Sequence, residues 1–124
     1  MYRDDRESIL LTLFGTSPKT RLLDLFMDNP LFEFTRNEMM EALGMAKVTL
    51  YGTLPDLEAG GVIEETRKIG KASLYRLNGD SAVVKNLGRL IRSYAVALGG
   101  TDSVEEATAG FVELGKQERL LAAS

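Results

Sequence analysis

The sequence contains no cysteine and no histidine among its 124 residues. Thiolate nucleophiles, imidazole bases and zinc sites built from these two residue types are therefore excluded. Glycine-rich phosphate loops of the P-loop or dinucleotide-binding type are also missing. An enzyme would have to rely on Asp, Glu, Lys, Ser, Thr or Tyr, and no clustered site of these residues can be identified. We expect a protein that is not an enzyme and that uses no cofactor and no metal.

Long apolar runs are missing as well. No run approaches the roughly 18 residues that a membrane-spanning helix requires. The first residues, Met1 to Glu7, lack the basic and apolar segments of a secretory signal. We therefore expect a cytoplasmic protein with no membrane partner.

The composition is that of an ordinary globular protein, with 44% hydrophobic and 27% charged residues. A chain of this length forms one domain with room for one appended element. The net charge of −3 argues mildly against a nucleic-acid partner. The distribution of charge matters more than its total, because a basic face can occur on an acidic protein.

Two helices are predicted in the first quarter of the chain. Residues 7–14 place Ile9, Leu10, Leu13 and Phe14 on one helical stripe, although so short an apolar run is also compatible with a strand. Ser17-Pro18 is a typical helix start, with a hydroxyl N-cap before a proline. Asn29-Pro30 ends this second helix, because proline disfavours the α conformation in the residue before it. A stub of strand is predicted at 32–34.

The next segment combines a capping box with a glycine turn. In Thr35-Arg36-Asn37-Glu38, the Thr35 hydroxyl and the Glu38 carboxylate can each accept a backbone N–H of the other residue. Gly44 is suited to a left-handed residue that ends this short helix. A longer helix follows, in which Leu50, Leu54 and Leu57 recur on one face. Pro55 is expected to kink this helix or to end it early.

After Gly60-Gly61 the periodicity changes from helix to strand. Residues 62–67 and 72–77 both suit strands, and Lys68-Ile69-Gly70-Lys71 joins them with a glycine that can adopt positive φ. The order is therefore a short helix, a turn, a longer helix and a β-hairpin, which is a helix-turn-helix followed by a wing. The predicted fold class is mostly α with a small β-hairpin, an α+β arrangement with flanking N- and C-terminal helices.

The order and spacing of these elements resemble a known family. The segment from Ser17 to Asn78 is similar to the winged helix-turn-helix transcriptional regulators of prokaryotes, especially archaea, a group that includes the MarR-like and ArsR-like repressors. The matching stretches are 17–23, 35–38, 46–51, 54–63 and 67–77. The resemblance implies a homodimer that binds double-stranded DNA, with the helix from Lys47 in the major groove and the hairpin on the backbone or minor groove.

Candidate DNA contacts follow from this arrangement. Residues near the N-terminal end of a recognition helix reach base edges, and basic residues on a wing reach phosphates. A solvated helix face and a hairpin tip charged for solubility are the alternative interpretations. Gly52 either allows close approach of the backbone or marks the loss of a base contact. The candidates are Thr35, Arg36, Lys47, Thr49, Tyr51, Gly52, Thr53, Arg67, Lys68 and Lys71.

The strongest helical period lies near the C-terminus, in a helix capped by Asp80 or Ser81. Its large apolar stripe is expected to supply dimer contacts, the alternative being that it packs entirely on its own domain. The expected dimerisation residues are Val84, Leu87, Leu90, Ile91, Tyr94 and Leu98, on a stripe that begins at Val83.

The predicted organisation has three parts. These are an N-terminal helix or strand at 1–16, the winged helix-turn-helix at 17–79 and a helical dimerisation extension at 80–124, with a last helix to about Leu121. A small-molecule effector cannot be identified from the sequence. The rival to DNA binding is a winged-helix module that binds protein, because the same fold is reused in assembly roles.

Overall fold

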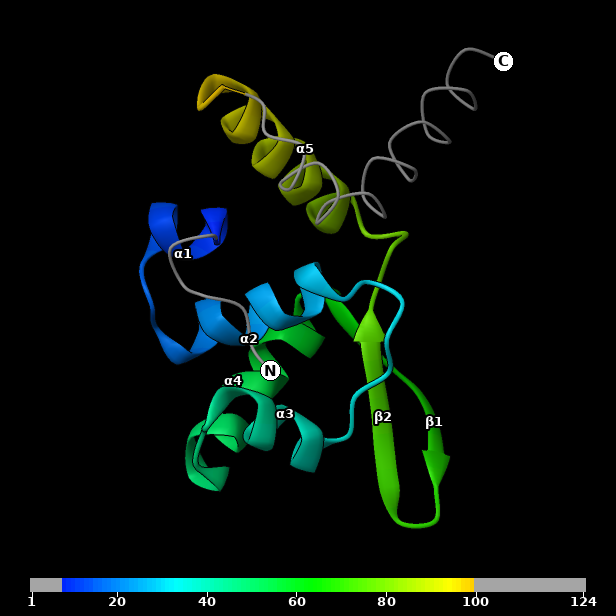
Figure 1. Ribbon diagram of the computed structural model, residues 1–124. Coiled ribbons are helices and arrows are strands. Elements are labelled where there is room, and N and C mark those ends of the chain that lie inside the picture. The colour runs from blue at the N-terminus through cyan, green and yellow to red at the C-terminus, as the bar shows by residue number, and fades with distance from the viewer. Residues whose placement is uncertain (1–7, 100–124) are drawn as a thin grey trace, which may run out of the picture.

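The computed structural model describes residues 8–99, which form five helices and one antiparallel hairpin (Figure 1). The elements are α1 (Ile9–Phe14), α2 (Pro18–Asp28), α3 (Arg36–Leu43), α4 (Lys47–Ala59), β1 (Ile63–Ile69), β2 (Ala72–Leu77) and α5 (Ala82–Ala97). α1 and α5 lie at one end of the molecule, and α3, α4 and the hairpin tip lie at the other, with α2 between them (Figure 1). The α+β fold class is confirmed. The helix predicted after residue 101 lies outside the described residues.

α1 is a helix rather than a strand, and Ser8 caps it by accepting the Leu11 N–H at 3.2 Å. Its buried residues are Ile9, Leu10 and Leu11. The predicted stripe is therefore wrong in its second half, since Leu13 and Phe14 are exposed. The helix has fewer than two turns, and its capped first turn is the part that packs into the core.

The predicted helix starts and stops around α2 and α3 are confirmed. Ser17 caps α2 with Pro18 in its first turn, and α2 ends at Asp28. At α3 the Thr35 hydroxyl accepts the Glu38 N–H at 3.1 Å, and the Glu38 carboxylate accepts the Thr35 N–H at 2.8 Å. Gly44 has a φ of 59° and turns the chain from α3 into α4. α4 then begins at Lys47, with Ala46 as an N-cap that makes no side-chain hydrogen bond.

α4 continues through Pro55 to Ala59. Leu50, Leu54 and Leu57 are buried as predicted. Because Pro55 is exposed, the Tyr51 carbonyl that loses its helical partner lies where water can replace the missing bond. The proline therefore does not end the helix.

The hairpin turn is shorter than predicted. Ile69 pairs with Ala72, so Gly70, with a φ of 61°, and Lys71 form a two-residue turn. The register shifts between Glu65 and Arg67, which makes Thr66 the extra residue of a β-bulge.

The predicted stub of strand before α3 is a single bridge. Phe34 pairs with Tyr75 through backbone bonds of 2.8 and 2.9 Å. The Phe34 ring also packs edge-on against Phe26, with 5.5 Å between the ring centroids. This bridge joins β2 to the helical part of the fold.

One hydrophobic core joins these elements. Leu22 and Phe26 of α2, Met39 of α3 and Leu50 of α4 are completely buried in it. α5 is capped by Ser81, one of the two predicted caps, and contributes Val84, Ile91 and Ala95 to the same core. Among the helices of residues 8–99, none is both long enough and apolar enough to cross a bilayer.

A buried hydrogen bond links α1 to α2. The Ser8 hydroxyl donates to the Asp24 carboxylate at 2.8 Å, and these residues are 1% and 3% exposed. Ser8 therefore has two tasks, as the N-cap of α1 and as a partner of a buried carboxylate.

We predict that Ser8→Ala lowers the free energy of unfolding by about 2–3 kcal/mol, because it removes a cap and a buried hydrogen bond to an acidic group. Ser17→Ala is the matched control, because Ser17 caps α2 at an exposed position. We expect it to cost about 1 kcal/mol. Urea denaturation of both variants measures the difference, and equal losses would contradict a structural role for the Ser8–Asp24 contact.

Candidate functional site

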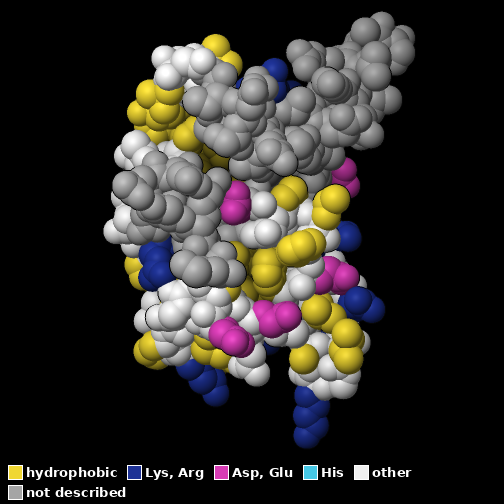
Figure 2. Space-filling model, in the orientation of Figure 1, with side chains coloured by type: hydrophobic (Ala, Val, Ile, Leu, Met, Phe, Trp, Pro, Cys, Tyr) yellow, Lys and Arg dark blue, Asp and Glu magenta, His cyan; other side chains and the backbone are white. Residues whose placement is uncertain are grey.

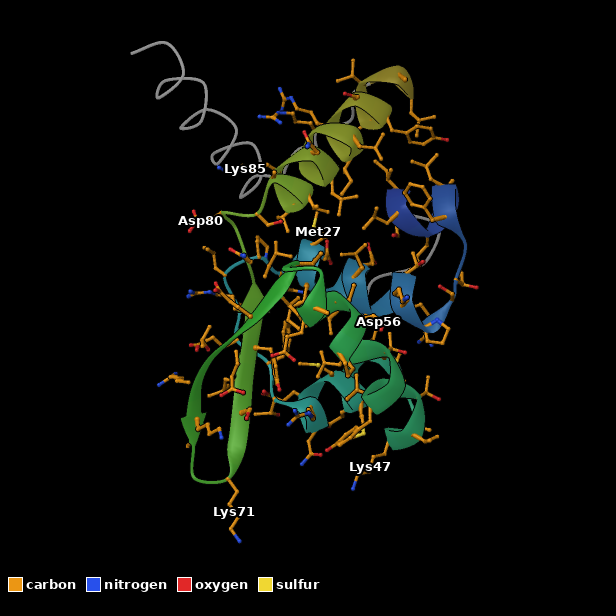
Figure 3. The ribbon with its side chains drawn as sticks, turned by 180° about the vertical axis from the view of Figure 1, so that it is seen from behind. Met27, Lys47, Asp56, Lys71, Asp80 and Lys85 are labelled. Atoms are coloured by element: carbon orange, nitrogen blue, oxygen red, sulfur yellow. The ribbon has the colours of Figure 1, made fainter. Side chains whose placement is uncertain are left out.

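Three segments far apart in the sequence meet at one end of the molecule. They are the start of α3, the first turns of α4 and the hairpin tip. Lys47 and Lys71 both project away from the body at this end, whereas Asp80 and Lys85 lie at the opposite end (Figure 3). An open hollow of about 280 Å³ lies between the three segments. It is lined by Thr35, Arg36, Asn37, Tyr51, Lys71, Ala72 and Ser73.

Arg36 is held in this hollow by two tyrosines. Its Nη2 atom donates to the Tyr75 hydroxyl at 2.6 Å, and its guanidinium carbon lies 5.1 Å from the Tyr75 ring centroid. The same carbon lies 5.4 Å from the ring centroid of Tyr51. Burial raises the pKa of Tyr75, with the Arg36 charge opposing the shift, so the phenol remains neutral and accepts the hydrogen bond. A positive charge is thereby fixed between α3, α4 and β2.

The Tyr51 ring also contacts a second cation, Lys47 of α4. The Lys47 Nζ atom lies 5.4 Å from the centroid of the Tyr51 ring, and Tyr51 is 47% exposed. Lys47 is exposed in the first turn of α4. Together Arg36, Tyr51 and Lys47 form a continuous surface of two cations about one aromatic ring.

The outward face of α4 differs in part from the predicted one. Thr53 is buried, and its Oγ1 atom donates to the Thr49 carbonyl at 2.8 Å. It lies on the helix side that carries Leu50 and Leu54, and its hydroxyl is already bonded within α4. Thr53 is therefore not part of the outward surface. Thr49 is half-buried at the edge of the face, and Gly52 is exposed.

The hairpin cations fall into two groups. Arg67 donates from Nε and Nη2 to the Glu33 carboxylate at 3.2 and 3.3 Å. Thr66, the bulge residue, donates to the same carboxylate at 2.5 Å. Arg67 is therefore bound to its own chain, whereas Lys68 and Lys71 are exposed at the tip.

The apolar residues that were predicted to form one stripe of α5 lie on two faces of the helix. Val84 and Ile91 are buried in the core of their own chain, so the expectation that they form dimer contacts is not met. The reason is the close spacing of 84, 88, 91 and 95, which forms the stripe that packs inward. Leu87 and Tyr94 are partly buried against the core. Val83, Leu90 and Leu98 are 50%, 39% and 64% exposed.

No family model matches the sequence, and no curated protein matches it. Within residues 8–99, no group of three or more carboxylates could hold a metal ion. What the site offers is a fixed guanidinium, three exposed lysines, an aromatic face and a hollow, which suits an extended anionic partner.

Three members of the site were not predicted from the sequence. Tyr75 is a strand residue, and its pairing with Arg36 needs the Phe34 bridge to place it. Glu33 was not expected to neutralise Arg67. Val48 was not considered, yet it is 81% exposed on α4. An apolar residue beside Lys47 at the start of a predicted recognition helix is the one signal that could have identified it.

The Glu33 contacts make stability depend on pH. The Thr66 hydroxyl, followed by the Arg67 guanidinium, lowers the pKa of the Glu33 carboxyl. Because the pKa is lower in the folded state, the stabilisation is complete above the ordinary pKa of about 4.3 and is lost as the pH falls through the folded value.

We predict that Glu33→Gln is less stable than the wild type at neutral pH, that the difference shrinks as the pH falls below the ordinary glutamate pKa of about 4.3, and that it disappears below the lowered pKa of the folded state. Urea denaturation of both proteins across this range measures it. Glu64→Gln, on the exposed side of β1, keeps the Glu33 contacts and should retain this acid-dependent loss. A constant difference between wild type and Glu33→Gln at all pH values would contradict the assignment.

Proposed function

We propose that this protein binds double-stranded DNA as a homodimer and regulates transcription. In this proposal α3, the Gly44 turn and α4 form a helix-turn-helix, and β1 and β2 form its wing. The observation that carries the proposal is that Arg36 and Lys71 line one hollow with Tyr51, while Lys47 lies beside the Tyr51 ring and projects at the same end of the molecule (Figure 3). A helix end and a hairpin tip that project together match the way in which winged helices engage a groove and the adjacent backbone.

The side chains suit different parts of the duplex. Lys47 and Thr49 are near the start of α4, where a recognition helix reaches base edges and phosphates. Lys68 and Lys71 suit phosphates or the minor groove at the wing. Arg36 is a pre-oriented phosphate partner, because the two tyrosines already fix its side chain. The Thr35 hydroxyl, which accepts from Glu38 N–H, can still donate one bond.

Two acidic residues of the proposed DNA-binding domain are paired with basic residues of the same chain, which leaves the net charge of −3 unchanged but reduces their repulsion of phosphates. Asp56 forms an ion pair with Lys19 at 2.9 Å, and Glu33 pairs with Arg67. Lys and Arg side chains project from the end formed by α4 and the hairpin tip (Figure 2). Four cations in each protomer, Arg36, Lys47, Lys68 and Lys71, can then face phosphates.

Two protomers are proposed to meet through a partly exposed stripe of α5, in which Val83 and Leu90 are exposed and Leu87 and Tyr94 are partly buried. Val83, Leu87, Leu90 and Tyr94 follow one another at spacings of four, three and four residues, the pattern of a helix that pairs with another helix. This stripe lies on the face beside the inward-packing one, and α5 is at the opposite end from the lysines. A second copy bound there leaves both proposed DNA surfaces free, as an inverted repeat requires.

The first prediction from this proposal concerns salt. Eight phosphates neutralised by a dimer give a slope of log K against log salt of about −7. The double variant Lys68→Ala/Lys71→Ala removes four of these contacts and should reduce the slope to about −3.5. Fluorescence anisotropy with a random-sequence duplex, titrated at several salt concentrations, measures both values.

Lys85→Ala is the matched control, because Lys85 lies at the opposite end of the molecule (Figure 3). It should retain the wild-type slope. Wild-type protein that binds no duplex even at low salt would contradict the DNA proposal and would favour the rival, a winged-helix module that binds protein.

The second prediction concerns assembly. Leu90→Glu places a charge in the middle of the exposed α5 stripe and should convert the dimer to a monomer, because the charge would be buried without a partner. Val96→Glu is the matched control, because Val96 is 59% exposed on another face of α5. Sedimentation equilibrium of the full chain measures the mass. A dimeric Leu90→Glu variant would exclude this stripe as the interface.

A further inference from the structure

Val48 is the most exposed large apolar residue of α4. It lies opposite the buried side chains of Leu50, Leu54 and Leu57 on the helix, and it is 81% exposed. A β-branched apolar residue there contributes nothing to the core and is not favoured by helix propensity. Its neighbours on the same stripe are Gly52, one turn later, and the partly exposed ring of Tyr51.

Gly52 is not required by the fold of its own chain. Its φ is not positive, and a Cβ atom added to it would meet nothing within 4 Å. Glycine inside a helix is nevertheless destabilising relative to alanine. What Gly52 does provide is open space on the surface of α4, one helical turn after Val48.

The outward stripe of α4 is therefore poor in hydrogen-bond donors. Val48, Gly52 and Pro55 offer none from their side chains, and Lys47 and Tyr51 at its edge are the polar members. Direct reading of guanine or adenine uses the bidentate side chains of Arg, Lys, Asn or Gln. Apolar contact in the major groove instead favours the C5 methyl group of thymine.

We infer that Val48 is a specificity-determining residue that contacts thymine methyl groups, with Gly52 providing the clearance for close approach. This inference rests on the proposed DNA binding. The occupant of the apolar stripe is identified by the charge nearby. Lys47 precedes Val48 and lies over the ring of Tyr51, and Tyr51 lines the hollow together with Arg36 and Lys71. A duplex presents methyl groups in the groove between two rows of phosphates, which is the complementary arrangement.

The test compares thymine with deoxyuridine, which lacks only the C5 methyl group. A duplex enriched from a random pool by the wild-type protein is synthesised in both forms, and its affinity is measured by anisotropy. The wild type should bind the deoxyuridine duplex more weakly, by about fourfold for each methyl group contacted, as the burial of one CH₂-sized group implies. Val48→Ala should bind both forms with nearly equal affinity.

Two further variants sharpen the result. Val96→Ala removes an equally apolar, exposed side chain from α5 and should retain the full thymine preference. Gly52→Ala should weaken binding to the thymine duplex and reduce the preference, because its methyl group fills the clearance. Both substitutions are at exposed positions, so folding is not at risk.

The possible failures are distinguishable. Salt-dependent binding with equal affinity for both duplexes would overturn the Val48 inference and leave the DNA proposal intact. A thymine preference that persists in Val48→Ala would show that another residue contacts the methyl groups. Failure to bind either duplex at low salt would contradict the proposed function itself.

Discussion

The Arg36 guanidinium is the point at which α3, α4 and β2 meet. It donates to the Tyr75 hydroxyl of β2 and lies within 5.4 Å of the Tyr51 ring centroid of α4. The backbone bridge between Phe34 and Tyr75 fixes the same strand to the residue just before the Thr35 cap. A two-stranded hairpin alone is marginally stable, so these contacts determine where its tip is held relative to α4. The spacing between Lys47 and the hairpin lysines depends on them.

The contacts within the chain also determine which cations of the site have a fixed orientation and which remain exposed. Arg36 is oriented before any partner binds, so little side-chain entropy remains to be lost on binding. Lys68 and Lys71 are exposed and free to adapt to a flexible backbone. Arg67, in contrast, is committed to Glu33 by a bulge that turns Thr66 towards the same carboxylate. The site is therefore rigid at its centre and adaptable at its edge, which suits a proposed contact that combines groove and backbone.

Local sequence signals predicted much of the fold. The Ser17 cap, the Thr35–Glu38 capping box and the Gly44 turn depend on residues close together in the chain, and each was correct. The buried face of α4 followed from the spacing of its leucines. What the sequence could not provide was tertiary context. The 83–98 stripe was too broad to show that Val84 packs inward while Leu90 stays exposed, and one register choice in the hairpin decides whether Arg67 faces solvent or Glu33.

The site was predictable to the extent that it follows from element order. Arg36, Tyr51 and Lys71 line the same hollow because a helix start, a helix surface and a hairpin tip are brought together. Thr53 does not belong to this set, because the spacing of Leu50, Thr53 and Leu57 already places it on the buried face, and its hydroxyl is used within the helix. Val48 and Tyr75 became apparent only when exposure and contacts were known.

We propose that the end formed by α3, α4 and the hairpin tip binds duplex DNA. The most direct test is a set of amide NMR spectra of the full chain, titrated with a duplex of about two helical turns at low salt. We expect shift changes concentrated at residues 35–37, 47–52 and 68–72, with α1 unaffected. Changes concentrated on α1 and α5, or no change at saturating duplex, would contradict it.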